Sequence, residues 1–196
     1  LRDRLFREGQ AGTRCLLDEP IVRDAVSAIR EELAEAKLMP TNSPAIQAIA
    51  FDKSPSANWK VTWHQDLMFP FARPATRPGF DLQSKKDGVD YARPPTAILE
   101  ELLAVRLHLD DCGVSNGPLR VSPGTHNLGV LRRAEVQGCV AKNGEVVCVA
   151  NEGNALIMRP LLLHASSPAI EPRHRRVLHI VFYSGMPISE QWFREV

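Results

Sequence analysis

The chain has 196 residues, which fits one domain, residues 1–196, with a substantial hydrophobic core. Its 24 basic and 23 acidic residues nearly cancel and form no block of like charge, so neither nucleic-acid binding nor a polybasic membrane patch is indicated. No apolar run is long enough to span a bilayer, and we expect a soluble, cytoplasmic protein whose partner is a small molecule. Nothing in the composition indicates an oligomeric state.

The four cysteines are widely spaced and include no Cys-x-x-Cys pair. They are Cys15, Cys112, Cys139 and Cys148. This spacing favours reduced thiols in the cytoplasm over a disulfide framework or a zinc site. The first residue is leucine rather than methionine, which favours a fragment of a longer chain and leaves a missing leader open.

An amphipathic helix is predicted over residues 18–38, because an Asp-Glu-Pro start precedes apolar residues at helical spacing. Packing against a sheet is its simplest role, with partner binding as the alternative. Strands are predicted over 45–51 and 59–64. The first strand is apolar except for Gln47, a buried amide that needs hydrogen-bond partners from the backbone or from a ligand.

Residues 69–95 contain five prolines and mixed charges, which predicts an irregular segment. Long irregular segments in compact domains are usually functional lids or disordered. Because this one begins three residues after Asp66, we expect a lid over an active-site mouth. Its aromatic side chains either contact substrate or simply pack the loop.

The rest of the chain predicts short strands separated by turns. A short helix over 96–103 runs into a strand over 104–109, and Asn116-Gly117 signals a hairpin. After a short helix near 128–134 come strands over 137–142 and 145–150 joined at Asn143-Gly144, and then strands over 155–158 and 176–183. This order predicts a mainly β fold with flanking helices, a β-sandwich or jelly roll.

The chemistry of the chain centres on His64 and Asp66. Residues two apart on a strand point to the same side, so this imidazole and carboxylate can face one point. A third ligand from another strand would complete the two-histidine, one-carboxylate face typical of non-haem Fe(II) oxygenases, and His164 is the candidate. An ordinary hydrogen-bonded pair and a core histidine are the alternatives.

A second His-x-Asp, His108-Leu109-Asp110, also ends a strand. We reject it because Asp110 and Asp111 lead into a turn, where aspartates commonly accept backbone hydrogen bonds. His126 is interpreted as a turn or wall residue. Among the later arginines, Arg175 shares strand parity with His179 and Tyr183, which favours it over Arg176 as the arginine of a polar pocket.

These residues resemble the phytanoyl-CoA dioxygenase-like branch of the Fe(II)- and 2-oxoglutarate-dependent oxygenases, over most of the chain from about Gln47 to Tyr183. The resemblance rests on the His-x-Asp pair at His64, the stretch from Leu109 to His126 with Asn-Gly-Pro-Leu and Pro-Gly-Thr-His, the Gly-Asn-Ala-Leu-Ile strand from Gly153, and His164 followed eleven residues later by Arg175.

The resemblance implies a double-stranded β-helix in which His64, Asp66 and His164 bind Fe(II). 2-Oxoglutarate would chelate the metal, with its far carboxylate held by Arg175, for which a guanidinium is well suited. Gln47 matches a position that often contacts the cosubstrate. The implied reaction uses O₂ to oxidise an unactivated C–H bond and converts 2-oxoglutarate to succinate and CO₂.

Asp66 occupies the place where related halogenases have a small residue, so hydroxylation, or another oxidation that keeps the carboxylate ligand, is expected. The competing functions are a cupin-like metal enzyme without 2-oxoglutarate and a non-catalytic ligand-binding jelly roll. The identity of the substrate is left open, with residues 69–95 and the wall around Arg106 and His108 expected to decide it.

Overall fold

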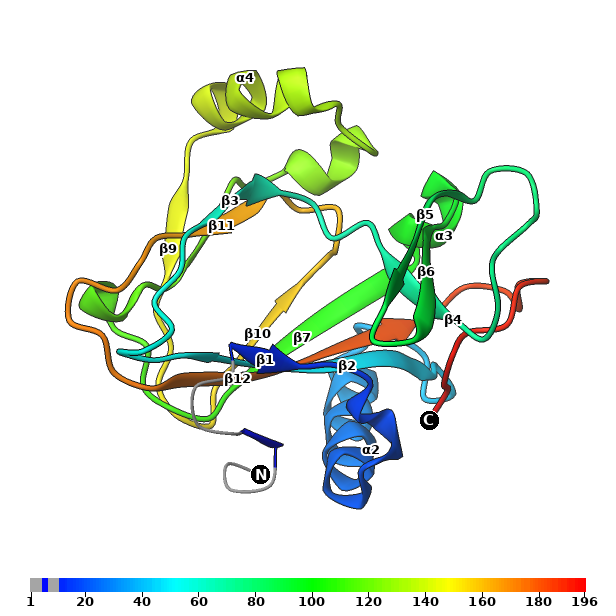
Figure 1. Ribbon diagram of the computed structural model, residues 1–196, viewed down its shortest axis with the longest axis horizontal. Helices are drawn as coiled ribbons and strands as arrows, with labels where there is room; N and C mark the ends of the chain where they lie inside the picture. Colours follow the sequence, from blue (N-terminus) through cyan, green and yellow to red (C-terminus); the bar gives the residue numbers. More distant parts are fainter. Residues whose placement is uncertain (1–4, 7–10) are drawn as a thin grey trace.

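The computed structural model describes residues 5–6 and 11–196 and contains two main antiparallel sheets that face each other (Figure 1). The five-stranded sheet has the order β1 (Gly12–Thr13), β2 (Ala45–Lys53), β12 (Arg175–Tyr183), β7 (Leu102–His108) and β10 (Ala155–Met158). The four-stranded sheet has the order β3 (Val61–His64), β11 (His164–Ser166), β8 (Leu119–Val121) and β9 (Val146–Cys148). The arrangement confirms the predicted mainly β, jelly-roll fold with flanking helices.

The predicted N-terminal helix is α2 (Pro20–Glu35), which follows the short η1 (Leu16–Asp18) and covers the outer face of the five-stranded sheet (Figure 1). Its buried side chains, Val22, Val26 and Leu33, recur at helical spacing and belong to one cluster with Ala50 of β2 and Ile180 of β12. The helix therefore stabilises the back of the sheet whose other face looks towards β3 and β11.

The predicted irregular segment over 69–95 is wrong, because a third antiparallel sheet forms there. Its order is β4 (Phe69–Phe71), β6 (Val89–Arg93) and β5 (Asp81–Lys86). Phe71 is buried and stacks on Trp192, with ring centroids 4.7 Å apart. Only Pro70 lies within a strand, in β4 at the edge of this sheet, and the other four prolines lie between or after the strands. Phe69, Phe71 and Tyr91 are buried and pack the interior.

The predicted strand over 137–142 is also wrong. After η3 (Thr125–Leu128), the chain forms α4 (Arg133–Asn143), and Gly144 ends it with φ 75°. The Glu135 carboxylate accepts from the backbone N–H of Arg132 at 2.8 Å, which caps the first turn. Asn143-Gly144 is thus a helix C-terminus, a role that the same dipeptide serves as readily as a hairpin turn.

Asn116-Gly117 does not form the predicted hairpin either. The short helix α3 (Thr96–Glu100) and β7 match their predictions, but β7 and β8 belong to different sheets, joined through η2 (Val114–Asn116). The Asn116 side chain accepts from the N–H of Arg173 at 3.2 Å and donates to the carbonyl of His174 at 3.4 Å. These two hydrogen bonds attach the connection between β7 and β8 to the segment that precedes β12.

Within the described ranges, every helix is too short or too polar to cross a membrane. All four cysteines are free thiols, and Cys112 is buried.

We predict that Gly117→Ala destabilises the protein by about 2–3 kcal/mol. Gly117 has φ 62°, and a Cβ atom there would lie 2.7 Å from the carbonyl oxygen of Ser167. The matched control is Gly124→Ala, where φ is 77° but no heavy atom lies within 4 Å of the added carbon. The control should lose only about 1 kcal/mol for the left-handed backbone. If urea unfolding showed the same loss of unfolding free energy in both variants, the backbone of Ser167 would have moved away from the added Cβ atom at no cost.

Candidate metal centre

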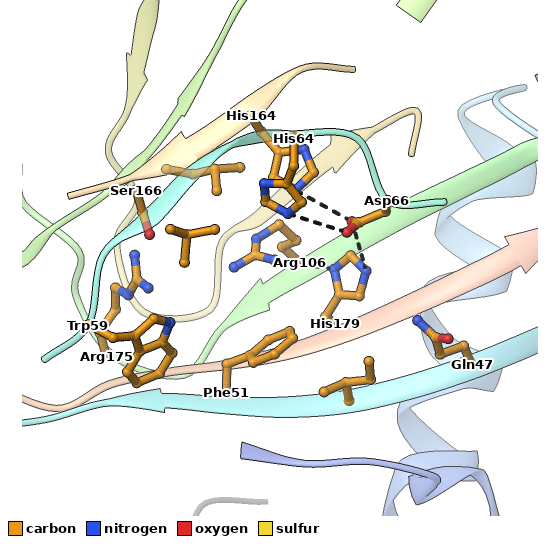
Figure 2. A pocket seen from close by; sticks show the side chains of 13 residues that line it. Gln47, Phe51, Trp59, His64, Asp66, Arg106, His164, Ser166, Arg175 and His179 are labelled. Atoms are coloured by element: carbon orange, nitrogen blue, oxygen red, sulfur yellow. Dashed lines mark hydrogen bonds and ion pairs between the residues drawn. The ribbon is translucent and has the colours of Figure 1, made fainter. Parts of the chain in front are cut away.

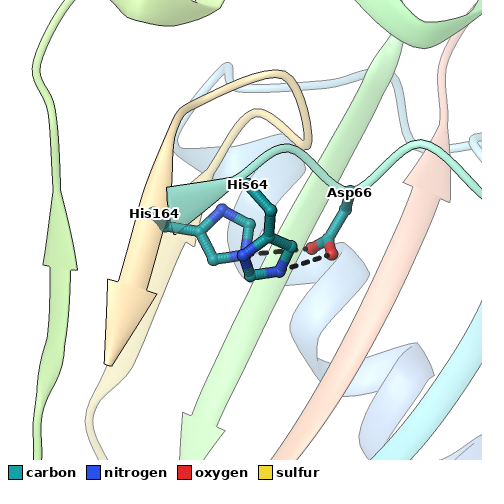
Figure 3. Close-up of side chains that lie close together, drawn as sticks. All are labelled: His64, Asp66 and His164. Atoms are coloured by element: carbon teal, nitrogen blue, oxygen red, sulfur yellow. Dashed lines mark ion pairs between the residues drawn. The ribbon is translucent and has the colours of Figure 1, made fainter. Parts of the chain in front are cut away.

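The register of two antiparallel strands brings the candidate histidines together. His64 at the end of β3 lies directly opposite His164 at the start of β11, with ring centroids 4.2 Å apart (Figure 3). Directly opposed residues project from the same face of a sheet. Two imidazoles that are 100 positions apart in sequence therefore reach the same point between the sheets.

Asp66 completes the group. Its carboxylate oxygens lie 3.6 Å from Nε2 of His64 and 3.5 Å from Nε2 of His164. Possible ligand atoms of the three residues all lie within 4.8 Å of one another. The structure thus brings together the three residues that the sequence predicts as metal ligands.

The intervening Gln65 holds this stretch of backbone in place. Its amide nitrogen donates to the carbonyls of Gly129 and Leu161 at 2.8 and 2.7 Å, and its oxygen accepts from the N–H of Leu131 at 2.9 Å. The Asp66 N–H donates to the carbonyl of Pro160 at 2.9 Å. Since Gln65 points away from the two ligands, its bonds orient them without competing for the centre.

Backbone carbonyls set the tautomers of both histidines. Nδ1 of His64 lies 2.8 Å from the carbonyl oxygen of Thr62, and Nδ1 of His164 lies 2.8 Å from that of Leu162. A carbonyl only accepts, so each Nδ1 carries the hydrogen, and each Nε2 presents its lone pair towards Asp66. Two imidazole nitrogens and one carboxylate are the donor set suited to a non-haem Fe(II) centre with open positions.

The protonation states also suit a metal. Burial penalises the charge of Asp66, but the surrounding imidazoles outweigh it and hold the pKa of its carboxyl below the usual range. Burial lowers the pKa of His164 to about 4, and burial together with Arg106 lowers the pKa of His179 to about 3. Burial also lowers the pKa of His64, but the Asp66 carboxylate, which accepts a hydrogen bond from Nε2 when the ring is protonated, raises it overall. Near neutral pH the site offers a carboxylate and an unprotonated His164.

The three residues open into a cavity of about 150 Å³ between the sheets, which we call the chamber (Figure 2). Its polar lining consists of Gln47, His64, Asp66, Arg106, His164, Ser166, Arg175 and His179. Its apolar lining consists of Ile49, Phe51, Trp59, Val61 and Leu119. The four-stranded sheet carries the two histidine ligands, whereas the five-stranded sheet carries the two arginines.

Arg175 faces the chamber and Arg176 faces away, as strand alternation predicts. Arg175 is buried, donates from Nη1 to the carbonyl of Gly117 and has no partner at Nε. Arg176 instead forms a paired contact with Asp110, with distances of 2.8 Å from Nε and 2.7 Å from Nη2. Arg175 therefore keeps donor capacity for a ligand.

Gln47 also lines the chamber, and its side-chain oxygen is buried without a hydrogen-bond partner. In the register of β12 it lies beside Val181, whereas Arg175 lies beside Lys53, so the two residues occupy opposite ends of the chamber (Figure 2). A buried acceptor that lacks a partner is costly unless a ligand or water supplies one.

The rejected alternatives lie elsewhere. His108 does not line the chamber, and Asp110 accepts from the backbone N–H of Arg176 at 2.8 Å, in agreement with the predicted turn role. Asp111 likewise accepts from the N–H of Glu152 at 2.8 Å. His126 lies in a separate surface hollow with Arg159. No residue of 69–95 lines the chamber, and the lid role of that segment stays a prediction.

Sequence reasoning missed Ser166 and Trp59. Ser166 was recognisable, since it follows His164 by two residues and so shares its face of β11. Its hydroxyl oxygen lies 3.2 Å from Nζ of Lys53, a fully buried lysine that also donates to the carbonyl of Ser167 at 2.8 Å. Trp59 is the first residue of the predicted strand over 59–64, and alternation there would place it on the face opposite to His64. The strand β3 begins only at Val61, so alternation does not hold for Trp59.

Comparisons with solved structures agree with the jelly-roll fold. The chain is 18% identical to AviO1 from Streptomyces viridochromogenes Tue57, with a TM-score of 0.60, covering 95% of this chain and 74% of that one. It is 18% identical to EctD from S. alaskensis in its apoform, with a TM-score of 0.62, covering 94% of this chain and 62% of that one. The same EctD is also known with bound Fe, and with 2-oxoglutarate and 5-hydroxyectoine.

A third similar structure is the non-heme alpha ketoglutarate dependent carbocyclase SnoK from nogalamycin biosynthesis, at 15% identity and a TM-score of 0.59, covering 88% of this chain and 62% of that one. The chain thus spans less than two thirds of EctD and of SnoK. A comparison with curated proteins finds no match. The family model for phytanoyl-CoA dioxygenase (PhyH) matches residues 4–177, and the chain belongs to this family.

Proposed function

We propose that the protein is an Fe(II)- and 2-oxoglutarate-dependent dioxygenase that hydroxylates, or otherwise oxidises, an unactivated C–H bond of a small molecule. The observation that carries the proposal is the pair of Nε2 lone pairs of His64 and His164 directed at the Asp66 carboxylate. Family membership and the Fe and 2-oxoglutarate bound by the similar EctD support it.

In this proposal His64, Asp66 and His164 hold the iron, which supplies the activation of O₂ coupled to conversion of 2-oxoglutarate to succinate and CO₂. The chain supplies orientation. Carbonyl hydrogen bonds hold the two imidazoles in the tautomer that binds a metal. Because Asp66 is present as a ligand, no position is freed for a halide, which favours hydroxylation.

Arg175 is proposed to hold the far carboxylate of 2-oxoglutarate. It is buried, it lies at the end of the chamber away from Gln47, and its Nε lacks a partner (Figure 2). A guanidinium can donate two parallel hydrogen bonds to a carboxylate. Gln47 then contacts the metal-bound end of the cosubstrate, because it lies on the Asp66 side.

The first test is anaerobic titration of Fe(II) with and without 2-oxoglutarate, monitored by the visible charge-transfer band of a chelated keto acid. We expect the band in the wild-type protein. In Arg175→Ala, the 2-oxoglutarate concentration needed for half the band should rise about 10- to 100-fold, as loss of hydrogen bonds to a charged group gives.

The matched control is Arg176→Ala on the opposite face of β12, which should leave this concentration unchanged. A larger effect from Arg176→Ala would mean that the strand register is wrong. Iron binding without any band would favour a cupin-like enzyme that uses no 2-oxoglutarate.

A second test removes the carboxylate ligand. Asp66→Ala should weaken Fe(II) binding by more than about 100-fold, since loss of an outer-shell partner alone costs about 10–100-fold. Substrate-coupled turnover should disappear with it. The control is Asp110→Ala in the second His-x-Asp, which should keep Fe(II) affinity even if its melting temperature falls. Full Fe(II) affinity in Asp66→Ala would contradict the proposed ligand set.

A further inference from the structure

Arg106 is a second buried cation in the chamber. It projects from β7, where its backbone pairs with His179 of β12, and its side chain lies below the two histidine ligands in Figure 2. Its Nη1 lies 3.4 Å from Nδ1 of His179, and its guanidinium lies 5.8 Å from the ring centroid of Phe51. Burial lowers its pKa to about 10, so Arg106 is still charged at neutral pH.

Nothing in residues 5–6 and 11–196 neutralises this charge at contact distance. Among those residues no carboxylate oxygen forms an ion pair with Arg106, the charge of Asp66 acts on it only at longer range, and its Nε has no hydrogen-bond partner. The nearby Cys112 is not a counter-charge, since burial raises the pKa of its thiol. By contrast, Arg176 has the carboxylate of Asp110. A buried, unpaired cation is costly, and the cost is removed when a ligand supplies the anion.

The proposed cosubstrate does not supply a spare negative charge. Two positive charges of the iron and one of Arg175 are matched by Asp66 and the two carboxylates of 2-oxoglutarate. The charge of Arg106 remains. The buried Lys53 is a further cation, but its amino group donates to Ser166 and Ser167 and faces the ring of Trp59 at 5.4 Å. The Nε of Arg106 has no partner of any kind, so a negative charge on the substrate would pair with Arg106.

The walls indicate what accompanies that charge. A second hollow of about 400 Å³, also lined by Arg14, shares Ile49, Phe51 and Trp59 with the chamber. A molecule that occupies both cavities would therefore lie along two aromatic rings. Phe51 lies next to Arg106, so the charged end of such a molecule reaches the guanidinium where the apolar wall ends.

We propose that the substrate is an acid with an apolar or aromatic body, whose carboxylate or equivalent acidic group binds Arg106 while its body lies along Phe51 and Trp59. The inference rests on the proposed function and adds the substrate class to it. Arg106 is then the residue that selects acids over neutral analogues.

The test compares two probes of the same shape, 3-phenylpropanoate and its neutral amide, by calorimetry. The protein is loaded with Zn(II), which supports no turnover, and each probe is titrated with and without saturating 2-oxoglutarate. We expect the acid to bind at least about tenfold more tightly than the amide, as one charge-assisted hydrogen bond gives. Arg106→Gln should abolish this preference and change 2-oxoglutarate affinity less than twofold, and Arg106→Lys should retain part of the preference.

Two results would overturn the inference while leaving the proposed function intact. One is equal affinity of the wild-type protein for the acid and the amide. The other is a tenfold loss of 2-oxoglutarate affinity in Arg106→Gln, which would assign Arg106 to the cosubstrate. If the loaded wild-type protein binds no 2-oxoglutarate, the proposed function fails, and the titrations without 2-oxoglutarate still measure the acid preference. Thermal melting checks folding, and Arg106→Gln should not melt lower, because it removes an unpaired charge.

Discussion

The antiparallel pairing of β3 with β11 is the constraint on which the site depends. Opposed positions in the register place His64 and His164 on one face, and one residue of slippage would turn either imidazole to the other side of the sheet. The register is fixed from both flanks, because β11 also pairs with β8. The candidate metal centre is therefore a product of strand order.

The two main sheets divide the chemistry of the chamber between them. β3 and β11 provide the two candidate histidine ligands, whereas β7 and β12 provide Arg106, Arg175 and His179. Facing sheets thus place imidazole nitrogens opposite fixed positive charge. Such a cavity favours anions before any ion is present, and α2 stabilises the back of the sheet that carries most of the charge.

Strand alternation is a local property, and it accounts for what the sequence could predict. It separated Arg175 from Arg176 on β12, because residues two apart share a face. Asp66 lies beyond the end of β3 at His64, and its place beside His64 also depends on the bond from its N–H to the carbonyl of Pro160. The choice of His164 needed the family resemblance, since the pairing of β3 with β11 is not local. Asn116-Gly117 and Asn143-Gly144 misled because an Asn-Gly pair fits a hairpin, a helix end or a crossing between sheets, and only the distant partners decide. The sequence also could not show that Arg106 lacks an ion pair, because that depends on how far every aspartate and glutamate lies from it in the folded chain.

The carbonyl bonds to His64 and His164 and the three bonds of Gln65 have a consequence for metal selection. Because they set the three ligands in advance, the site is ready for any divalent ion that accepts two nitrogens and an oxygen. Along the first-row metals, the affinity of such a donor set rises from Fe²⁺ through Co²⁺ and Ni²⁺ to Cu²⁺, and Zn²⁺ also exceeds Fe²⁺. Loading with iron is then decided by which ions the cell keeps free and by what the open positions bind, rather than by the intrinsic affinity of the triad.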